Sequence, residues 1–469
     1  MCIGAPDPGL TAVSGMAAVT ELCDRLGVVE ALDVGVGPIK QRDRGFGAGE
    51  LLVGLACAQW AGEDFLVGLD RQRRDVAGQV LVPVAGLSST TAAGLARRVT
   101  DPQWRGVETG LARVTERVLH RIPVARRARL CASVTIDLDA TDVEVYGRKK
   151  RGVDYNYQGQ RSGRPHVASW AETETVLAAE LLSGHDDPRS YAAGLLRRAL
   201  AALPGSAGSG RVRLRADAGY FAGELARVAF CEGVQFAIGA KRIAPLWRLL
   251  AGIAEADWAE AIDMDGAQVA VADYRPDWWP AKTFLLVRRV RLDIAQVSAD
   301  SRSRRRRTLH PDQRALPLAE LAEADAIYGY SFILTNLDVS TPDKAAVVEY
   351  WYRHRTSVEN IFRDSKHGAA LRHLPSLIFS SLIDHGVELG RCVVDGVGGV
   401  AVGGCSQHGP MSFADLPFGV SRSPRMSAIR CSPSARARAS RSCWLSCSSR
   451  RMRSVAACRR CSSEVSVAR

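Results

Sequence analysis

The sequence lacks the segments that carry a chain into or through a membrane. Its 469 residues contain no run of 18 apolar residues, and Asp7 precedes the first basic residue, Arg25. A membrane-spanning helix needs about 20 apolar residues, and a secretion signal begins with a positive region. These absences argue against both kinds of segment, and we expect a protein that acts in the cytoplasm without a membrane partner.

Cysteine is scarce through most of the chain. Five cysteines are scattered before Cys392, and seven lie at or after it. Such a distribution excludes a disulfide framework in the first 390 or so residues. Four late cysteines resemble the spacing of a structural zinc site: Cys443, Cys447, Cys458 and Cys461. The segment around them is so rich in Ser and Arg that we interpret them as part of a compositional bias.

The first 420 residues also have almost no net positive charge. Residues 421–469 hold 12 Arg and one acid, Glu464, which gives +11 of the formal net charge of +12. The rest of the chain carries about +1, so any affinity of that part for nucleic acid must come from local basic patches. Two candidates are residues 148–151 and 304–307.

Helical periodicity dominates the first 125 residues. Segments 47–69 and 88–120 place apolar residues at steps of three and four, and Ser88 to Thr91 offer helix caps. We therefore predict a helical N-terminal domain over residues 1–125. Its alternative functions are simple packing as a bundle and recognition of DNA ends.

Strand periodicity begins at Ser133, where apolar and polar residues alternate as far as Asp139. A turn and residues 143–146 follow, which predicts a hairpin. Residues 211–217 repeat the alternation, with the arginines expected to point outward, and a short helix that ends at Gly233 comes next.

The pattern changes again after residue 240. Short strand candidates and several tryptophans predict a β-rich insertion over residues 240–326. It divides a region of mixed strands and helices into residues 126–239 and 327–375. The second part contains a strand and then one long helix over residues 341–368, with Pro342 in its first turn.

Three carboxylates stand at positions typical of a metal site. Asp139 and Asp217 each end a predicted strand, and Glu359 lies on the long helix. Such elements meet at one edge of a mixed sheet, where oxygen ligands hold hard cations. Two cations about 4 Å apart promote phosphoryl transfer. Asp137 shares a strand face with Asp139 and is the alternative first ligand.

Four polar residues of the long helix share one face: Tyr352, Arg355, Glu359 and Lys366. At about 100° per residue they fall within an arc of about 60°. Arg355 and Lys366 suit neutralisation of phosphates, and Tyr352 suits stacking on a base or bonding to a phosphate oxygen. The plainer alternative is a solvated helix surface on which Arg355 pairs with Glu359.

The spacing of these four residues, Y-x2-R-x3-E-x6-K, resembles the signature of DDE transposases of bacterial insertion sequences. The segment Asp139-Ala140-Thr141 is similar to the first-aspartate motif of that family, and RADAGYF around Asp217 is similar to the second. Residues 155–174, YNYQGQRSGRPHVASWAETE, resemble its actinobacterial branch. The resemblance covers residues 1–375.

This resemblance implies an α/β protein with an RNase H-like mixed sheet, a β insertion, and cut-and-paste transposition of DNA. Asp139, Asp217 and Glu359 are then the catalytic triad and hold two Mg²⁺ ions, for which Mn²⁺ can substitute. The three residues Tyr352, Arg355 and Lys366 contact the transposon end. The implied partners are double-stranded DNA, as terminal inverted repeats and target, and a second copy of the chain in a homodimer on the nucleoid.

The resemblance ends after about Pro375, where a Ser-, Arg- and Cys-rich tail begins. Arg outnumbers Lys 55 to 7, which indicates a GC-rich gene, and out-of-frame translation of such a gene yields residues of these types. We hypothesise a frameshift or fusion there and a disordered segment over residues 376–469. The alternatives are then a catalytically inactive remnant that only binds DNA, or a nuclease that cuts without joining.

Overall fold

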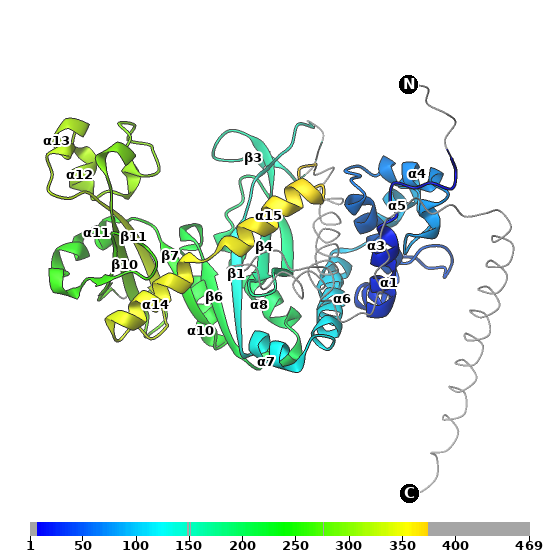
Figure 1. The fold of residues 1–469 in the computed structure, drawn as a ribbon, viewed down its shortest axis with the longest axis horizontal. Helices are drawn as coiled ribbons and strands as arrows, with labels where there is room; N and C mark the ends of the chain where they lie inside the picture. Colours follow the sequence, from blue (N-terminus) through cyan, green and yellow to red (C-terminus); the bar gives the residue numbers. More distant parts are fainter. Residues whose placement is uncertain (1–6, 148–149, 151, 275, 374–469) are drawn as a thin grey trace, which may run out of the picture.

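The computed structural model describes residues 7–147, 150, 152–274 and 276–373 (Figure 1). The N-terminal helices lie at one end of an elongated molecule, and a large mixed sheet extends from its middle to the other end. Within these ranges no helix has both the length and the apolar character needed to cross a bilayer. The hypothesis about the tail after Pro375 lies outside the described residues.

Helices α1 to α7 form the N-terminal part, so the helical periodicity is confirmed. A close contact joins α2 and α6, where a Cβ added to Gly35 would lie 2.4 Å from the carbonyl oxygen of Gly106. Ser88 caps α5 by accepting a hydrogen bond from the amide of Thr91 at 3.1 Å. The bounds are α1 Met16–Leu26, α2 Val28–Val36, α3 Ala48–Trp60, α4 Val67–Arg74, α5 Ser89–Ala96, α6 Asp101–Leu119 and α7 Val124–Ala132, with a 3₁₀ turn, η1, at Gly78–Val80.

The described strands form one 11-stranded sheet in the order β2-β4-β1-β6-β7-β11-β10-β9-β8, with β3 and β5 also paired to β4. The pairs β1–β6 and β6–β7 are parallel, and the other pairs are antiparallel. The bounds are β1 Ser133–Ala140, β2 Val143–Glu144, β3 Asp154–Tyr155, β4 Arg161–Trp170, β5 Thr175–Ser183, β6 Arg211–Ala216, β7 Gln235–Ala240, β8 Ala259–Glu260, β9 Ala267–Ala272, β10 Phe284–Arg291 and β11 Tyr328–Thr335. The chain is thus a mixed α/β protein.

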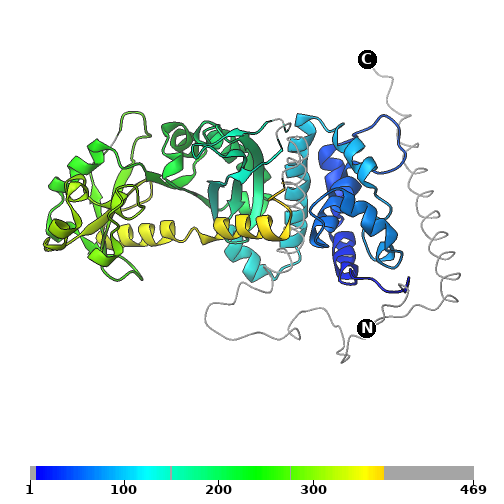
Figure 2. The same cartoon turned by 90° about the horizontal axis from the view of Figure 1, so that it is seen from above.

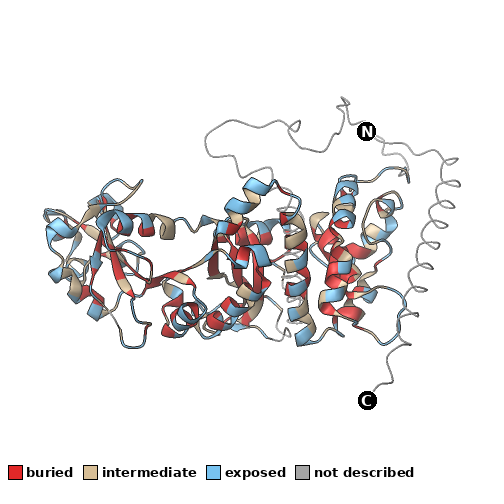
Figure 3. Cartoon of the chain, turned by 90° about the horizontal axis from the view of Figure 1, so that it is seen from below, coloured by how far each residue is buried: buried red, intermediate tan, exposed pale blue. Residues whose placement is uncertain are grey.

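Strand β1 is covered on both faces, and Figure 3 shows the central strands largely in the colour of buried residues. Its apolar residues belong to a core with α8 (Arg189–Ala202) and α10 (Gly223–Cys231). Its polar residues meet α14 (Pro342–Arg353) and α15 (Thr356–Gly368), since Trp351 Nε1 donates to Thr135 Oγ1 at 3.3 Å. The predicted alternation is confirmed, and neither face is left to solvent.

Two details of the strand prediction are wrong. The strands β1 and β2 form no hairpin in the described sheet, because both pair with β4. The arginines of β6 do not all point outward either: Arg215 is buried, and Arg213 lies over the Trp351 ring, 4.8 Å from its centre. Long-range partners, which local alternation does not reveal, cause both differences.

Residues between β7 and β11 hold the strands β8, β9 and β10, and these continue the central sheet through β11. Short helical turns fill the rest of this segment. Those near its end pack around a small apolar cluster that contains Leu309 and Leu321, whereas Leu246 and Trp247 of α11 belong to the main core. The bounds are α11 Ala244–Leu249, η3 Leu250–Gly252, η4 Glu255–Asp257, η5 Ile294–Gln296, η6 Arg306–Thr308, α12 Pro311–Ala315 and α13 Leu318–Ala322; α9 Gly205–Gly208 and η2 Ala218–Tyr220 flank β6.

The single long helix predicted over residues 341–368 is wrong. The helices α14 and α15 lie end to end along the molecule (Figure 2), and the chain leaves helical geometry at His354, with φ −85° and ψ 60°. His354 Nδ1 lies 2.6 Å from the carbonyl oxygen of Tyr350, and the side chain of Arg355 turns toward β1. The helical wheel therefore does not extend from Tyr352 to Glu359.

Candidate active site

Asp139 and Asp217 lie side by side at the ends of two parallel strands. The register pairs Leu138 of β1 with Ala216 of β6. Asp139 directly follows Leu138, and Asp217 directly follows Ala216. Asp217 Oδ1 accepts a hydrogen bond from the Gly219 amide at 2.8 Å, which fixes the carboxylate at the start of η2. Both aspartates line an open cleft of about 530 Å³.

The environment of Asp139 disfavours its charged form. Burial raises its pKa to about 6, and the negative charges of Asp217 and Glu359 act in the same direction, while Arg355 and the Ala140 amide oppose them. A carboxyl group with two negative neighbours gains from any cation that enters the cleft. The charges of Asp217 and Glu359 thus both act on Asp139.

Glu359 lies in the first turn of α15, where it is exposed. A neighbouring face of α15 anchors the helix, because Val358, Ile361 and Phe362 are buried against residues of the sheet that include Val167. Such anchoring explains how an exposed glutamate keeps a defined position.

Asp137, the alternative first ligand, is held in the interior. Its two carboxylate oxygens accept hydrogen bonds from Arg215 Nε at 2.7 Å and Arg215 Nη2 at 2.8 Å, and Ser357 Oγ donates to Oδ2 at 3.1 Å. The Asp137 side chain has 0% exposure. Its lone pairs are thus occupied by protein donors, whereas Asp139 opens on the cleft.

The signature residues around Glu359 contact the backbone next to the aspartates. Tyr352 Oη donates to the carbonyl of Ala216 at 3.2 Å, and Gly239 leaves room for it, since a Cβ there would lie 2.6 Å from Tyr352 Oη. Arg355 Nη2 donates to the carbonyl of Leu138 at 3.2 Å and lies 3.8 Å from Asp139 Oδ2.

Lys366 contacts the residues that follow Asp139 and Ala140 in the chain. Its Nζ donates to Thr141 Oγ1 at 2.6 Å and to the carbonyl of Asp142 at 3.3 Å. Each of the three predicted DNA-contacting residues therefore has a partner on a carboxylate-bearing strand or just beyond it. Their contact with DNA stays a prediction.

The oxygen atoms of Asp139 and Asp217 suit a hard divalent cation, because both carboxylates line one cleft. Their negative charges also repel each other, and a cation between them would reduce this repulsion. In the described part of the chain, however, no three His, Cys, Asp or Glu side chains are gathered into a group that could hold a metal ion. The two aspartates thus fit as two ligands of a metal ion. In this arrangement Glu359 does not form a three-residue ligand group with them.

The sequence analysis missed two buried groups behind the cleft. Tyr220 follows Asp217 by three residues, and its hydroxyl has no hydrogen-bond partner among the residues that the structure describes. Burial and then the charges of Asp139 and Asp217 raise its pKa well above the usual range. His166 stacks on Tyr220 with ring centres 5.6 Å apart. The motif RADAGYF contains the tyrosine, but only the parallel register brings it behind Asp139.

Comparison with known proteins gives one family. Residues 8–381, well over half of the chain, match the family model described as Transposase DDE domain group 1. No curated protein matches the chain. Among solved structures, it is similar to the piggyBac transposase synaptic complex with hairpin DNA, determined by cryo-EM, at 11% identity and a TM-score of 0.37, over 81% of this chain and 74% of that chain.

Proposed function

Because the chain belongs to group 1 of the DDE transposase domain family, we propose that it cleaves DNA at transposon ends and joins those ends to target DNA in a metal-dependent reaction. The observation that carries the proposal is the parallel register of β1 and β6, which sets Asp139 beside Asp217. The negative charge of Glu359 raises the pKa of Asp139, which supports Glu359 as the third carboxylate of the site. The RNase H-like fold and the domain divisions given above are part of this proposal.

In this function Asp139, Asp217 and Glu359 would hold Mg²⁺ or Mn²⁺. When bound, two such ions supply activation of the attacking oxygen and stabilisation of the leaving oxygen in phosphoryl transfer. Asp139 must be ionised to act as a ligand. Arg355 restrains Asp139 through the Leu138 carbonyl, and Tyr352 restrains Asp217 through the carbonyl of Ala216.

We propose that DNA reaches this site along basic residues near the end of α15. A cleft of about 620 Å³ is lined by Lys150, Lys366 and Arg372 and by Phe65 of the N-terminal part. Cationic side chains there would contact phosphates and position the duplex without reading its sequence. The N-terminal helices would recognise inverted repeats, and a homodimer on the bacterial nucleoid would hold two ends.

Cleavage of a labelled fragment that carries the element's own ends tests the proposal. The protein and its Glu359→Gln variant are compared with Mg²⁺ and with Mn²⁺. We expect the protein to cut, and the variant to lose at least about 100-fold in rate, since a neutral amide is a poor ligand for a hard cation.

Three results would contradict parts of the proposal. Binding without cutting by either protein would identify a DNA-binding remnant. Cutting without joining to a target plasmid would identify a nuclease. Equal cutting by both proteins would remove Glu359 from the site.

A further inference from the structure

We propose that Tyr157 is a stacking platform for an unpaired nucleobase of the DNA at the carboxylate cleft; this inference rests on the proposed function for the identity of the ligand as DNA. Tyr157 is 86% exposed, which is high for an aromatic residue, and it lines the same cleft as Asp139 and Asp217. An aromatic ring held at a polar cleft is available to a ligand with a flat π-face.

The loop that carries Tyr157 is fixed by internal hydrogen bonds. It joins β3 to β4, and the Asn156 amide donates to the carbonyl of Gln160 at 2.8 Å. The side-chain oxygen of Asn156 accepts from the amides of Gln158 and Gln160, both at 3.0 Å. Gly159 completes the turn with φ +76°, a conformation that favours glycine. The tyrosine is therefore exposed on an ordered turn.

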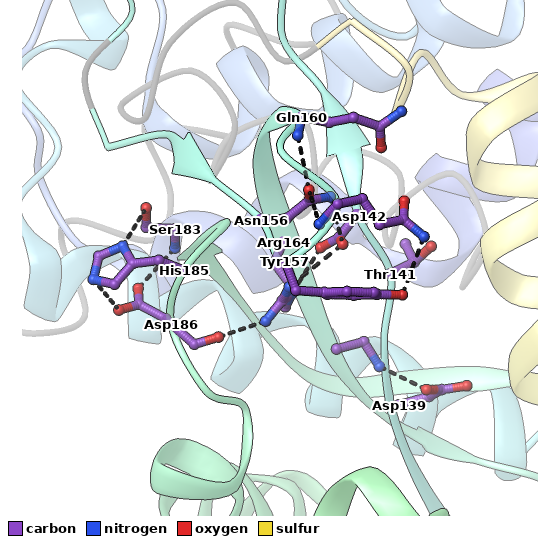
Figure 4. Close-up of polar contacts among 12 residues, drawn as sticks. Asp139, Thr141, Asp142, Asn156, Tyr157, Gln160, Arg164, Ser183, His185 and Asp186 are labelled. Atoms are coloured by element: carbon purple, nitrogen blue, oxygen red, sulfur yellow. Dashed lines mark hydrogen bonds and ion pairs between the residues drawn. The ribbon is translucent and has the colours of Figure 1, made fainter. Parts of the chain in front are cut away.

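A second set of bonds ties this loop to Asp142, in the turn after β1 (Figure 4). Asn156 Nδ2 donates to Asp142 Oδ2 at 3.0 Å, and Arg164 Nε donates to Asp142 Oδ1 at 2.7 Å. Arg164 Nη1 also donates to the carbonyl of Asp186 at 2.5 Å. The position of Tyr157 is thus coupled to the segment that holds the carboxylates, as a substrate-positioning group requires.

The chemistry of the cleft selects a nucleotide as the occupant. Lys241, which is exposed, lies in the same cleft and provides a positive charge for a phosphate. The carboxylates suit cations, which would neutralise a second phosphate. A ring beside such groups matches the base and phosphate of one nucleotide. Bases inside a duplex already stack on each other, so the ring is open only to an unpaired base.

Fluorescence of 2-aminopurine tests the proposal without cleavage. The probe is a duplex with a single-stranded overhang that carries 2-aminopurine, mixed with the protein in Ca²⁺ in place of Mg²⁺. We expect the protein to quench the probe by stacking. Tyr157→Phe should retain the quenching, whereas Tyr157→Ala should lose it and bind the overhang DNA about 10-fold more weakly.

The matched control is Tyr155→Ala, because Tyr155 is 63% exposed on the neighbouring strand and does not line the cleft. It should bind and quench like the unaltered protein, and a blunt duplex should bind equally well to all variants. Quenching that survives in Tyr157→Ala, or an equal loss in Tyr155→Ala or on blunt DNA, would overturn the proposal. Because binding is measured, a failure to cleave in the preceding experiment does not affect this result.

Discussion

Asp137 and Asp139 lie two residues apart on one strand face, yet they have different environments. The parallel register pairs Asp137 with Arg215 and leaves Asp139 one step beyond the last pair. The sequence left both aspartates open as the first ligand of the proposed metal site. The choice between them depends on the neighbouring strand, 78 residues later in the chain. Only the register of β1 and β6 distinguishes the two aspartates.

The raised pKa of Asp139 predicts a pH dependence of DNA cleavage. Its carboxyl group keeps its proton below about 6 and is charged above that value, so a metal ion competes with the proton as the pH falls. At a subsaturating concentration of Mg²⁺, we expect the cleavage rate to be flat near pH 8 and to fall about 10-fold per unit below about pH 6. A pH–rate profile measures this.

DNA binding at each pH is the control for that profile, since it excludes loss of the substrate complex. A rate that stays constant from pH 7 to pH 5 would show that Asp139 does not titrate in this range. A break near pH 4 would show that its environment does not favour the protonated form.

At the scale of elements, the sequence predicted types better than connections. Helical periodicity identified the N-terminal helices, and alternation identified β1, β6 and β11. It did not reveal the break between α14 and α15, because Arg355 leaves the helix for a carbonyl 217 residues earlier, at Leu138. Local patterns carry no information about a partner so distant.

Two glycine substitutions should have opposite effects on stability, because Gly35 lies in the close contact between α2 and α6 and Gly94 does not. Gly35→Ala should destabilise the protein by about 2 kcal/mol, because its Cβ would lie 2.4 Å from the Gly106 carbonyl oxygen. Gly94→Ala, within α5, meets nothing within 4 Å and should stabilise the protein by up to about 1 kcal/mol. Urea unfolding measures both, and similar shifts in the two variants would contradict the close contact.

At the scale of the whole molecule, a partly buried chain of ion pairs connects the N-terminal helices to the sheet. Glu108 of α6 accepts from Arg198 of α8 at 2.5 Å, and Arg198 Nη1 donates to Glu180 of β5 at 2.7 Å. Glu180 in turn lies 3.0 Å from His166 Nδ1, and His166 stacks on Tyr220 behind the cleft. The N-terminal helices and the two aspartates of the cleft are thus connected through one network of contacts.

Glu108→Gln tests how far this network holds the molecule together. We expect a loss of about 2 kcal/mol in the free energy of unfolding, because Glu108 is buried and the partly buried Arg198 loses one of its two charged partners. Glu30→Gln is the matched control: its carboxylate also binds an arginine, Arg117 at 2.9 Å, but is 69% exposed, so the loss should stay below about 1 kcal/mol. Equal losses, measured by thermal unfolding, would contradict the distinction.

The insertion shares its sheet with the proposed catalytic domain, and this constrains how the protein can be shortened. Strand β11 pairs with β7 on one side and with β10 of the insertion on the other. Deleting residues 241–326 would turn β11 into an exposed edge with unpaired amides and carbonyls, including those opposite Leu285 and Val287. Such an edge recruits strands from other molecules, so a shortened protein should form aggregates.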